Sequence, residues 1–179
     1  MSAVPQEVIP PRKLDLGCGK NKKDGFLGVD SRQFEGVDLV CDLRGKWPWD
    51  DESVDEVNCS HFLEHLDAAE RIHFANELHR VLKKGAKASI VTPHFASVRA
   101  YGDLTHKWPP VVSFWYLYLN AEWRKANAPH NDAYKCDFDH GYGFGLHPTV
   151  QARNQEYQNY AVVHLLEGAQ DLHVTLTKR

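Results

Sequence analysis

Short apolar runs separated by glycine, aspartate and charged residues dominate the first half of the chain. Runs of this length, bounded by turn-forming residues, are typical of buried strands. The runs that predict strands are Lys13–Leu16, Phe26–Asp30, Val37–Cys41, Val54–Cys59 and Lys87–Thr92. Because they succeed one another with crossover segments between them, we expect a mostly parallel sheet.

One helix is predicted between the fourth and fifth strands, because apolar positions recur at helical spacing from Ala69 to Leu82. Asp67 is the expected N-cap, and Glu70 completes a capping box three residues later. The run Lys83-Lys84-Gly85 is expected to close the helix, with basic residues in the last turn and a C′ glycine.

The second half of the chain is less regular. Val111–Glu122 predicts an aromatic-rich helix, and Asn127–Tyr157, rich in glycine, proline and polar residues, predicts a long loop. Tyr160–Leu166 and Leu172–Thr177 predict an antiparallel hairpin at the sheet edge. The expected fold is a single three-layer, Rossmann-like α/β domain with a mostly parallel, seven-stranded sheet.

Composition narrows the class of protein. A chain of 179 residues suits one domain, in which we expect 1–11 to be an irregular lead-in and 94–158 a substrate or lid region. A net charge of -3 argues against an extended nucleic-acid footprint. The four cysteines form no C-x-x-C pair, and no apolar run approaches the ~18 residues of a membrane span. We therefore expect a cytoplasmic protein with reduced cysteines and no membrane contact, of an oligomeric state that composition leaves open.

Candidate binding residues follow four predicted strands. The first strand runs into a glycine turn, Asp15-Leu16-Gly17-Cys18-Gly19, which lets a ligand lie against bare main chain. Asp30 ends the second strand, Asp42-Leu43 follows the third and Ser60-His61 follows the fourth. A glycine turn alone fits a plain structural turn, but four such strand ends meet at one edge of a parallel sheet and favour a ligand site.

In this order the motifs resemble those of the class I S-adenosylmethionine (SAM)-dependent methyltransferases, specifically the methyltransferase type 11 group. Trp47–Val57 is similar to the family segment LPF-x-D-x-SFD-x-V, His61–His65 to x-x-LEH, and Leu78–Ala86 to E-x-x-RVLKPGG. Together with the glycine turn and Gly28-Val29-Asp30, the resemblance covers roughly residues 12–95.

The resemblance implies SAM as the cofactor. By it, Asp15, Gly17, Cys18 and Gly19 surround the methionine part and Asp30 holds the ribose. Asp42 with Leu43 holds the adenine, while Ser60 and His61 line the floor of the site. One feature departs from the family, since only Lys20–Gly25 separates the turn from the second strand, too few residues for the usual first helix. Lys20, Asn21, Lys22 and Lys23 either replace that helix toward the ligand or form a solvated turn.

The methyl acceptor is expected beyond the fourth and fifth strands. We expect His94, Asp103 and His106 to be catalytic, by binding the acceptor or accepting its proton, although such residues also pair simply to fix a loop. Tyr101 is a further candidate. Glu64 and His65 either take part or orient the turn between strand and helix.

Two further features leave alternatives open. His61 and His65 have the spacing of helical metal ligands, but no second tight pair accompanies them, so no metal site is expected. The aromatic residues of the second half either cap the active site or pack on the sheet; they are Trp108, Phe114, Trp115, Tyr116, Tyr118 and Trp123. Tyr134–Leu146 is interpreted as a mobile lid or a rigid loop.

The expected function is methyl transfer from SAM to a nitrogen, oxygen or carbon nucleophile of a small molecule or nucleotide. One alternative is a SAM-binding protein without transferase activity, such as a sensor or scaffold. A second is a nicotinamide-dependent oxidoreductase, against which Lys22 counts, because it replaces the third glycine of the dinucleotide motif. Asn58-Cys59-Ser60-His61 lacks the double proline of DNA amino-methyltransferases and disfavours that class.

Overall fold

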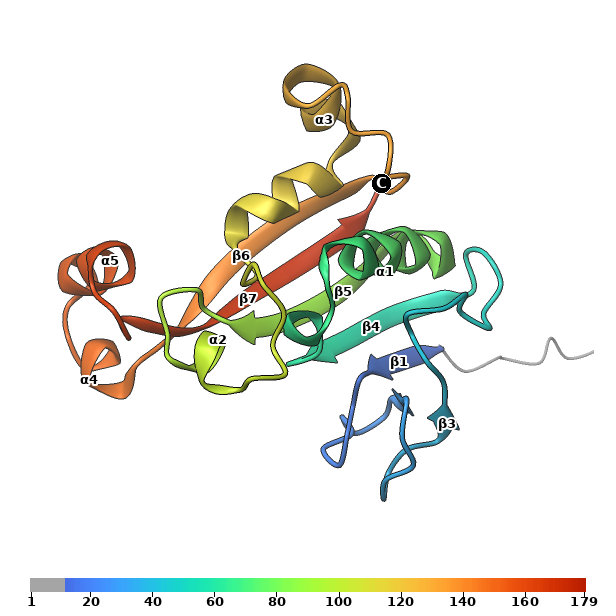
Figure 1. Ribbon diagram of the computed structural model, residues 1–179, viewed down its shortest axis with the longest axis horizontal. Coiled ribbons are helices and arrows are strands. Elements are labelled where there is room, and N and C mark those ends of the chain that lie inside the picture. The colour runs from blue at the N-terminus through green and yellow to red at the C-terminus, as the bar shows by residue number, and fades with distance from the viewer. Residues whose placement is uncertain (1–11) are drawn as a thin grey trace, which may run out of the picture.

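The computed structural model describes residues 12–179; the irregular lead-in expected for 1–11 lies outside them. Seven strands form one sheet in the order β3-β2-β1-β4-β5-β7-β6 (Figure 1). The parallel strands are β1 Lys13–Leu16, β2 Leu27–Asp30, β3 Leu39–Val40, β4 Val54–Ser60 and β5 Leu82–Pro93. The antiparallel strands are β7 Ala169–Lys178 and β6 Phe138–Leu146. The predicted mostly parallel sheet with antiparallel C-terminal strands is confirmed.

Helix α1, Ala68–Val81, begins as predicted. The Asp67 carboxylate accepts a hydrogen bond from the Glu70 backbone N–H, and the Glu70 carboxylate accepts one from Asp67. Its predicted end is wrong, because Leu82 is buried and already paired with Val54 in the sheet. Gly85, expected just beyond the helix, lies within β5 with a φ of 77°.

The predicted helix 111–122 is divided in two. Ser113–Leu119 forms 3-10 turns, η2, and Ala121–Asn127 forms α3. The break falls at Asn120, whose side chain accepts a hydrogen bond from Trp123 N–H and so starts α3. A polar N-cap inside the apolar run therefore outweighs its continuous helical pattern.

The predicted loop 127–157 and strand 160–166 are both wrong. The loop region contains β6, which pairs with β7, and α4, Pro148–Gln151. The alternating Gly-Tyr-Gly-Phe-Gly of β6 conceals a strand, because glycine is uncommon in strand interiors. Helix α5, Gln155–His164, occupies the expected strand, and its N-cap Asn154 accepts from Tyr157 N–H. The antiparallel pair is thus β6 with β7.

Helical cover is concentrated on one face of the sheet. Helix α1 and the η2 segment lie over this face (Figure 1), which buries alternate residues such as Ile90 and Leu176. The opposite face of β5, β7 and β6 carries exposed Lys87, His173 and Thr175. The second helical layer implied by a three-layer domain is therefore incomplete, and α4 with α5 lies near the end of the sheet instead.

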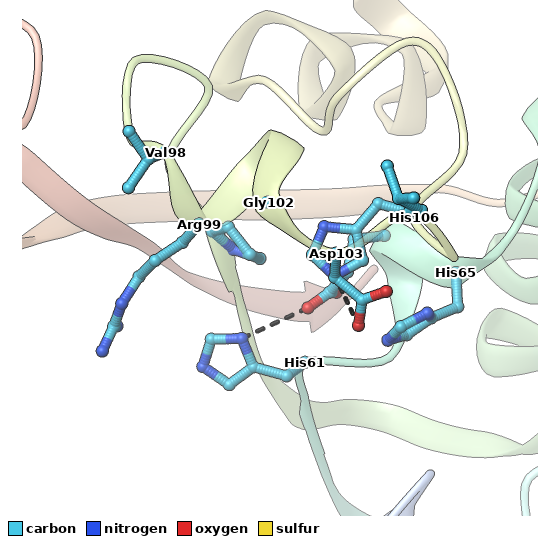
Figure 2. A pocket seen from close by; sticks show the side chains of 10 residues that line it. His61, His65, Val98, Arg99, Gly102, Asp103 and His106 are labelled. Carbon is cyan, nitrogen blue, oxygen red and sulfur yellow. Dashed lines mark hydrogen bonds and ion pairs between the residues drawn. The ribbon is translucent and has the colours of Figure 1, made fainter.

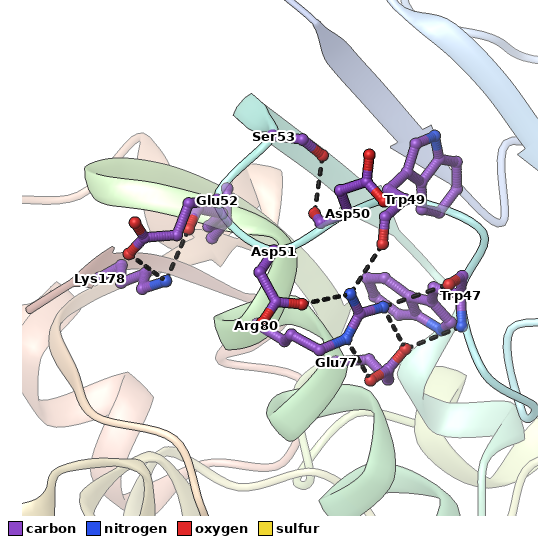
Figure 3. Close-up of polar contacts among 10 residues, drawn as sticks. Trp47, Trp49, Asp50, Asp51, Glu52, Ser53, Glu77, Arg80 and Lys178 are labelled. Carbon is purple, nitrogen blue, oxygen red and sulfur yellow. Dashed lines mark hydrogen bonds and ion pairs between the residues drawn. The ribbon is translucent and has the colours of Figure 1, made fainter.

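The segment between β3 and β4 has no helix and is held against α1 by Arg80 (Figure 3). The Arg80 guanidinium donates to the carbonyl oxygens of Trp47 and Trp49 and to the carboxylates of Asp51 and Glu77. Glu77 also accepts from Trp47 N–H, and its pKa is lowered chiefly by the hydrogen bond from Arg80. This network keeps Trp47 in the core.

In the part of the chain from residue 12 onward, no helix is both long and apolar enough to cross a lipid bilayer.

Candidate functional site

The glycine turn after β1 folds back on β2. The backbone N–H groups of Gly17 and Cys18 both donate to Val29 O, at 2.8 and 3.1 Å. Gly17 has a φ of 69°, and a Cβ there would lie 2.5 Å from Cδ2 of Phe62. Gly19 also has a positive φ, 53°, but no atom lies within 4 Å of where its Cβ would be. Gly17 is thus required for packing, whereas Gly19 offers bare backbone to open space.

Two carboxylates organise this turn. Asp30 accepts from Gly19 N–H at 3.0 Å, which ties the open end of the turn to the end of β2. Asp15 is buried, and its oxygens accept from Lys23 N–H and from the Asn58 side-chain amide, both at 2.7 Å. The short crossover is therefore held by Asp15 in place of a helix.

The lysines of this crossover make different contacts. The Lys22 ammonium forms an ion pair with Asp38 at 2.9 Å, and Lys23 reaches the side-chain oxygen of Asn58 at 3.5 Å. Lys20 lies 5.9 Å from the centre of the Phe34 ring. Lys22 thus serves the fold of the turn, while Lys20 extends at its exposed rim.

Asp42 and Leu43 lie beside Asp30 at the same sheet edge, because Cys41 N–H donates to Asp30 O at 2.8 Å. The Asp42 carboxylate is half exposed and pairs with Arg44, whose hydrogen bonds lower the pKa of Asp42. The Leu43 side chain is buried in the core. The Leu43 side chain therefore offers no exposed surface at this edge.

Ser60 and His61 end β4 beside this edge. His61 has a left-handed backbone, φ 54°, and donates its N–H to Val91 O at 2.9 Å. Its ring Nδ1 lies 3.2 Å from Oε1 of Glu64, and its Nε2 lies 4.0 Å from Asp171. The hydrogen bond to Glu64 raises the pKa of His61 although burial opposes the charge. Strained backbone of this kind clusters at functional sites.

An open pocket of about 850 Å³ adjoins His61 (Figure 2). It is lined from the β4 side by His61, Glu64 and His65, and from the segment after β5 by residues that include Arg99, Asp103 and His106. Of the three residues predicted to be catalytic, two therefore share one pocket.

His94, the third, is placed differently. It is 4% exposed, stands outside the pocket lining, and packs against the rings of Phe95 and Phe144. Burial lowers its pKa. Ala96 N–H points at its Nδ1 at 3.4 Å, so His94 contacts the start of the segment that lines the pocket.

The segment after β5 is fastened by Arg71, a residue that the sequence patterns do not single out. This buried guanidinium donates to Leu63 O on one side and to the carbonyls of Lys107 and Pro109 on the other. Lys107 N–H in turn donates to Glu64 O at 2.7 Å. These bonds join residues 107–109 to the turn that carries Glu64.

A second cavity, of about 400 Å³, is mainly apolar and is lined by residues such as Phe95, Tyr101, Trp108 and Trp115. The segment from residue 95 to residue 108 contributes five exposed apolar side chains to the lining of these two pockets: Phe95, Val98, Tyr101, Leu104 and Trp108. Exposed apolar groups that gather in this way mark a binding surface.

Most of the aromatic cluster packs. Tyr116 is fully buried, and Trp115 and Tyr118 pack on the core, while Phe114 and Trp123 contact each other. The predicted lid, Tyr134–Leu146, is wrong over most of its length, because β6 is paired with β7 from Phe138 onward.

Comparison with known proteins agrees with this architecture. Residues 14–90 match the methyltransferase domain family. A SAM-dependent methyltransferase from Archaeoglobus fulgidus superimposes with a TM-score of 0.69 at 20% identity, over 94% of this chain and 86% of that one. One from Mesorhizobium loti gives 0.52 at 17% identity, over 93% and 90%. The YcgJ protein from Bacillus subtilis gives 0.55 at 14% identity, over 94% and 92%. No curated protein sequence matches this chain.

The fold is Rossmann-like, and the chain shares it with SAM-dependent methyltransferases of known structure. The family match confirms the predicted resemblance to the type 11 methyltransferases over residues 14–90 and supports SAM as the cofactor.

Proposed function

We propose that this protein transfers a methyl group from SAM to a nitrogen, oxygen or carbon nucleophile of a small molecule or nucleotide. The observation that carries the proposal is the continuity of one sheet edge. Bare backbone at Gly19 and the carboxylates of Asp30 and Asp42 stand at the ends of β1 to β3. The His61 pocket opens at the ends of β4 and β5.

Each half of this edge suits one reactant. Carboxylates accept hydrogen bonds from ribose hydroxyls and an adenine amino group, and we assign these roles to Asp30 and Asp42. The acceptor then occupies the pocket, where Asp103 and His106 contact it, and its apolar part lies toward Trp108 and the neighbouring cavity. His94 is assigned a positioning role, because it is buried beneath the segment that lines the pocket.

Methyl transfer is an in-line displacement, so the protein acts mainly by holding the acceptor opposite the leaving sulfur. The nucleophile forms a bond to the methyl carbon as the carbon–sulfur bond breaks, and S-adenosylhomocysteine leaves as the product. An acceptor that must lose a proton requires a base nearby. The pocket supplies carboxylates and imidazoles for that purpose.

Calorimetry with SAM and S-adenosylhomocysteine tests the cofactor half. Asp42→Ala should weaken S-adenosylhomocysteine binding about tenfold, because one charge-assisted hydrogen bond is lost. Asp51→Ala is the matched control, since it also removes an exposed carboxylate from an arginine pair, at the other end of β4. Absence of binding heat with both nucleosides would refute the proposal.

Mass spectrometry with methyl-deuterated SAM tests the transfer half, using panels of catechols, aromatic amines and nucleosides as acceptors. A product that carries the labelled methyl group identifies an acceptor. Binding of S-adenosylhomocysteine without any labelled product across these panels would favour the sensor or scaffold alternative.

A further inference from the structure

We propose that Glu64, His65 and His106 form a binding site for a divalent transition-metal cation. One donor atom from each of the three residues lies within 4.8 Å of the other two. The two imidazole rings stand edge to face with centroids 4.8 Å apart, and Figure 2 shows them side by side in the pocket wall. His65 precedes α1 and His106 follows β5, so the fold alone brings them together.

The Glu64 carboxylate is an independent indication of a ligand. The residue is 4% exposed and lines the pocket. Its Oε1 faces His61, whereas its Oε2 is buried and, within residues 12–179, has no hydrogen-bond partner. The nearby Arg71 guanidinium donates its hydrogen bonds to three backbone carbonyls and not to Glu64. A buried carboxylate oxygen without a partner is costly, and a bound cation would remove that cost.

The hydrogen bonds behind His65 leave its Nε2 free to bind a metal. The single hydroxyl proton of Thr105 is donated to Asp103 Oδ1 at 2.7 Å, so Thr105 Oγ1 can only accept from His65 Nδ1 at 3.0 Å. His65 Nδ1 therefore carries the ring proton, and Nε2 carries the lone pair. A carboxylate behind a histidine is the usual support of a metal ligand.

The same reasoning applies to His106. Its Nδ1 lies 3.2 Å from Ala100 O, a carbonyl oxygen that only accepts, so the proton resides on Nδ1. Its Nε2 then carries the lone pair and makes no hydrogen bond to residues 12–179; Asp103 Oδ2 lies 4.0 Å from it. Both imidazoles are thus held in the tautomer that binds a metal through Nε2, next to the Glu64 Oε2 atom, which has no hydrogen-bond partner among residues 12–179.

The donor set selects the kind of cation. Two imidazole nitrogens with one carboxylate oxygen suit Zn²⁺, Fe²⁺, Mn²⁺ or Co²⁺, whereas Mg²⁺ and Ca²⁺ prefer oxygen ligands throughout. Three protein ligands leave coordination positions open toward the pocket. If methyl transfer is the activity, as proposed above, those positions would hold an oxygen or nitrogen atom of the acceptor; binding of the cation does not depend on that proposal.

The test is titration of the full chain, free of any histidine tag, with Co²⁺ followed by visible absorption and with Zn²⁺ by calorimetry. One equivalent should bind. His65→Gln and His106→Gln should each lose the site, whereas His130→Gln, in an exposed loop, should keep it. Thermal melting without metal shows whether each variant is folded.

Thr105 gives the sharpest comparison. Thr105→Val keeps the shape but removes the oxygen behind His65, and should weaken binding about 10- to 100-fold. Thr105→Ser keeps the hydroxyl and should bind like the native chain. Absence of binding, survival of the Co²⁺ spectrum in both histidine variants, or unchanged affinity in Thr105→Val would overturn the proposal. Affinity for S-adenosylhomocysteine and formation of labelled product, both measured separately without metal, decide the proposed function independently of this site.

Discussion

Replacing Gly17 and Gly19 of the glycine turn by alanine, one at a time, should separate effects on folding from effects on cofactor binding. In Gly17→Ala the new Cβ meets Phe62 at 2.5 to 2.8 Å, and the contacts include Cβ of Phe62, which cannot swing away. Left-handed backbone costs a non-glycine residue about 1–2 kcal/mol, and overpacking costs about 1–3 kcal/mol. We expect Gly17→Ala to lose about 2–5 kcal/mol of the free energy of unfolding.

Gly19→Ala carries the backbone cost alone, because nothing lies within 4 Å of its Cβ position. It should lose about 1–2 kcal/mol. The methyl group would occupy the space assigned to the cofactor, so binding of S-adenosylhomocysteine should fall much more than stability does. Urea unfolding gives the first quantity, and calorimetry of the folded variants gives the second.

The double variant Gly17→Ala/Phe62→Ala checks the cause. Removing the ring should make the two substitutions less costly together than the sum of the single losses. The reasoning would be refuted if Gly19→Ala destabilised the chain as much as Gly17→Ala, or if Gly19→Ala bound S-adenosylhomocysteine with unchanged affinity.

Three further outcomes are expected. Arg80→Lys should lose about 2 kcal/mol in urea unfolding, because an ammonium cannot bridge two carbonyls and the Glu77 carboxylate at once; an unchanged midpoint would contradict this. The pKa of His79 is lowered below 6.5, chiefly by burial and then by Lys178, so the unfolded chain takes up a proton first as pH falls. Stability should therefore drop from pH 6.5 downward, and His79→Leu should flatten that part of a plot of melting temperature against pH. An equal slope would show that other groups control it. On β7, Leu176→Ala should lose about 2–5 kcal/mol and Thr175→Ala within about 0.5 kcal/mol in urea unfolding; equal losses would mean that both faces of the sheet are buried.

The proposed cofactor half of the site was predictable from the sequence because its residues lie close to the strand ends. The candidate binding residues lie at or just after the ends of short apolar runs. Parallel strands bring their carboxyl ends to one edge of the sheet, whatever the loops between them do. Asp30 and Asp42 needed no tertiary information beyond that rule. The roles of Phe62 against Gly17 and of Asp15 in holding Lys23 N–H did need it, since both contacts join segments that the pattern treats separately.

The acceptor half was less predictable because distant contacts place it. His94 and His106 both follow β5, yet one is buried under Phe144 and the other faces the pocket. Arg71 fastens residues 107–109, next to His106, through hydrogen bonds that no periodicity records. The sequence spacing of His61 and His65 resembles that of two helical metal ligands, whereas the imidazole ring beside His65 in the structure belongs to His106.

The polar far face of the sheet and the missing first helix are two aspects of one arrangement. A helix packed on that face would need apolar side chains beneath it, but the face presents Lys87 and Thr175, and Lys13 paired with Glu56 at 2.7 Å. The chain therefore connects β1 to β2 by a short loop that Asp15 holds. The helix N-terminus that would attract the ligand carboxylate is lost with it. Among the described residues, Lys20 is an exposed lysine of this loop that forms no ion pair, and we propose that it meets that negative charge in place of the helix.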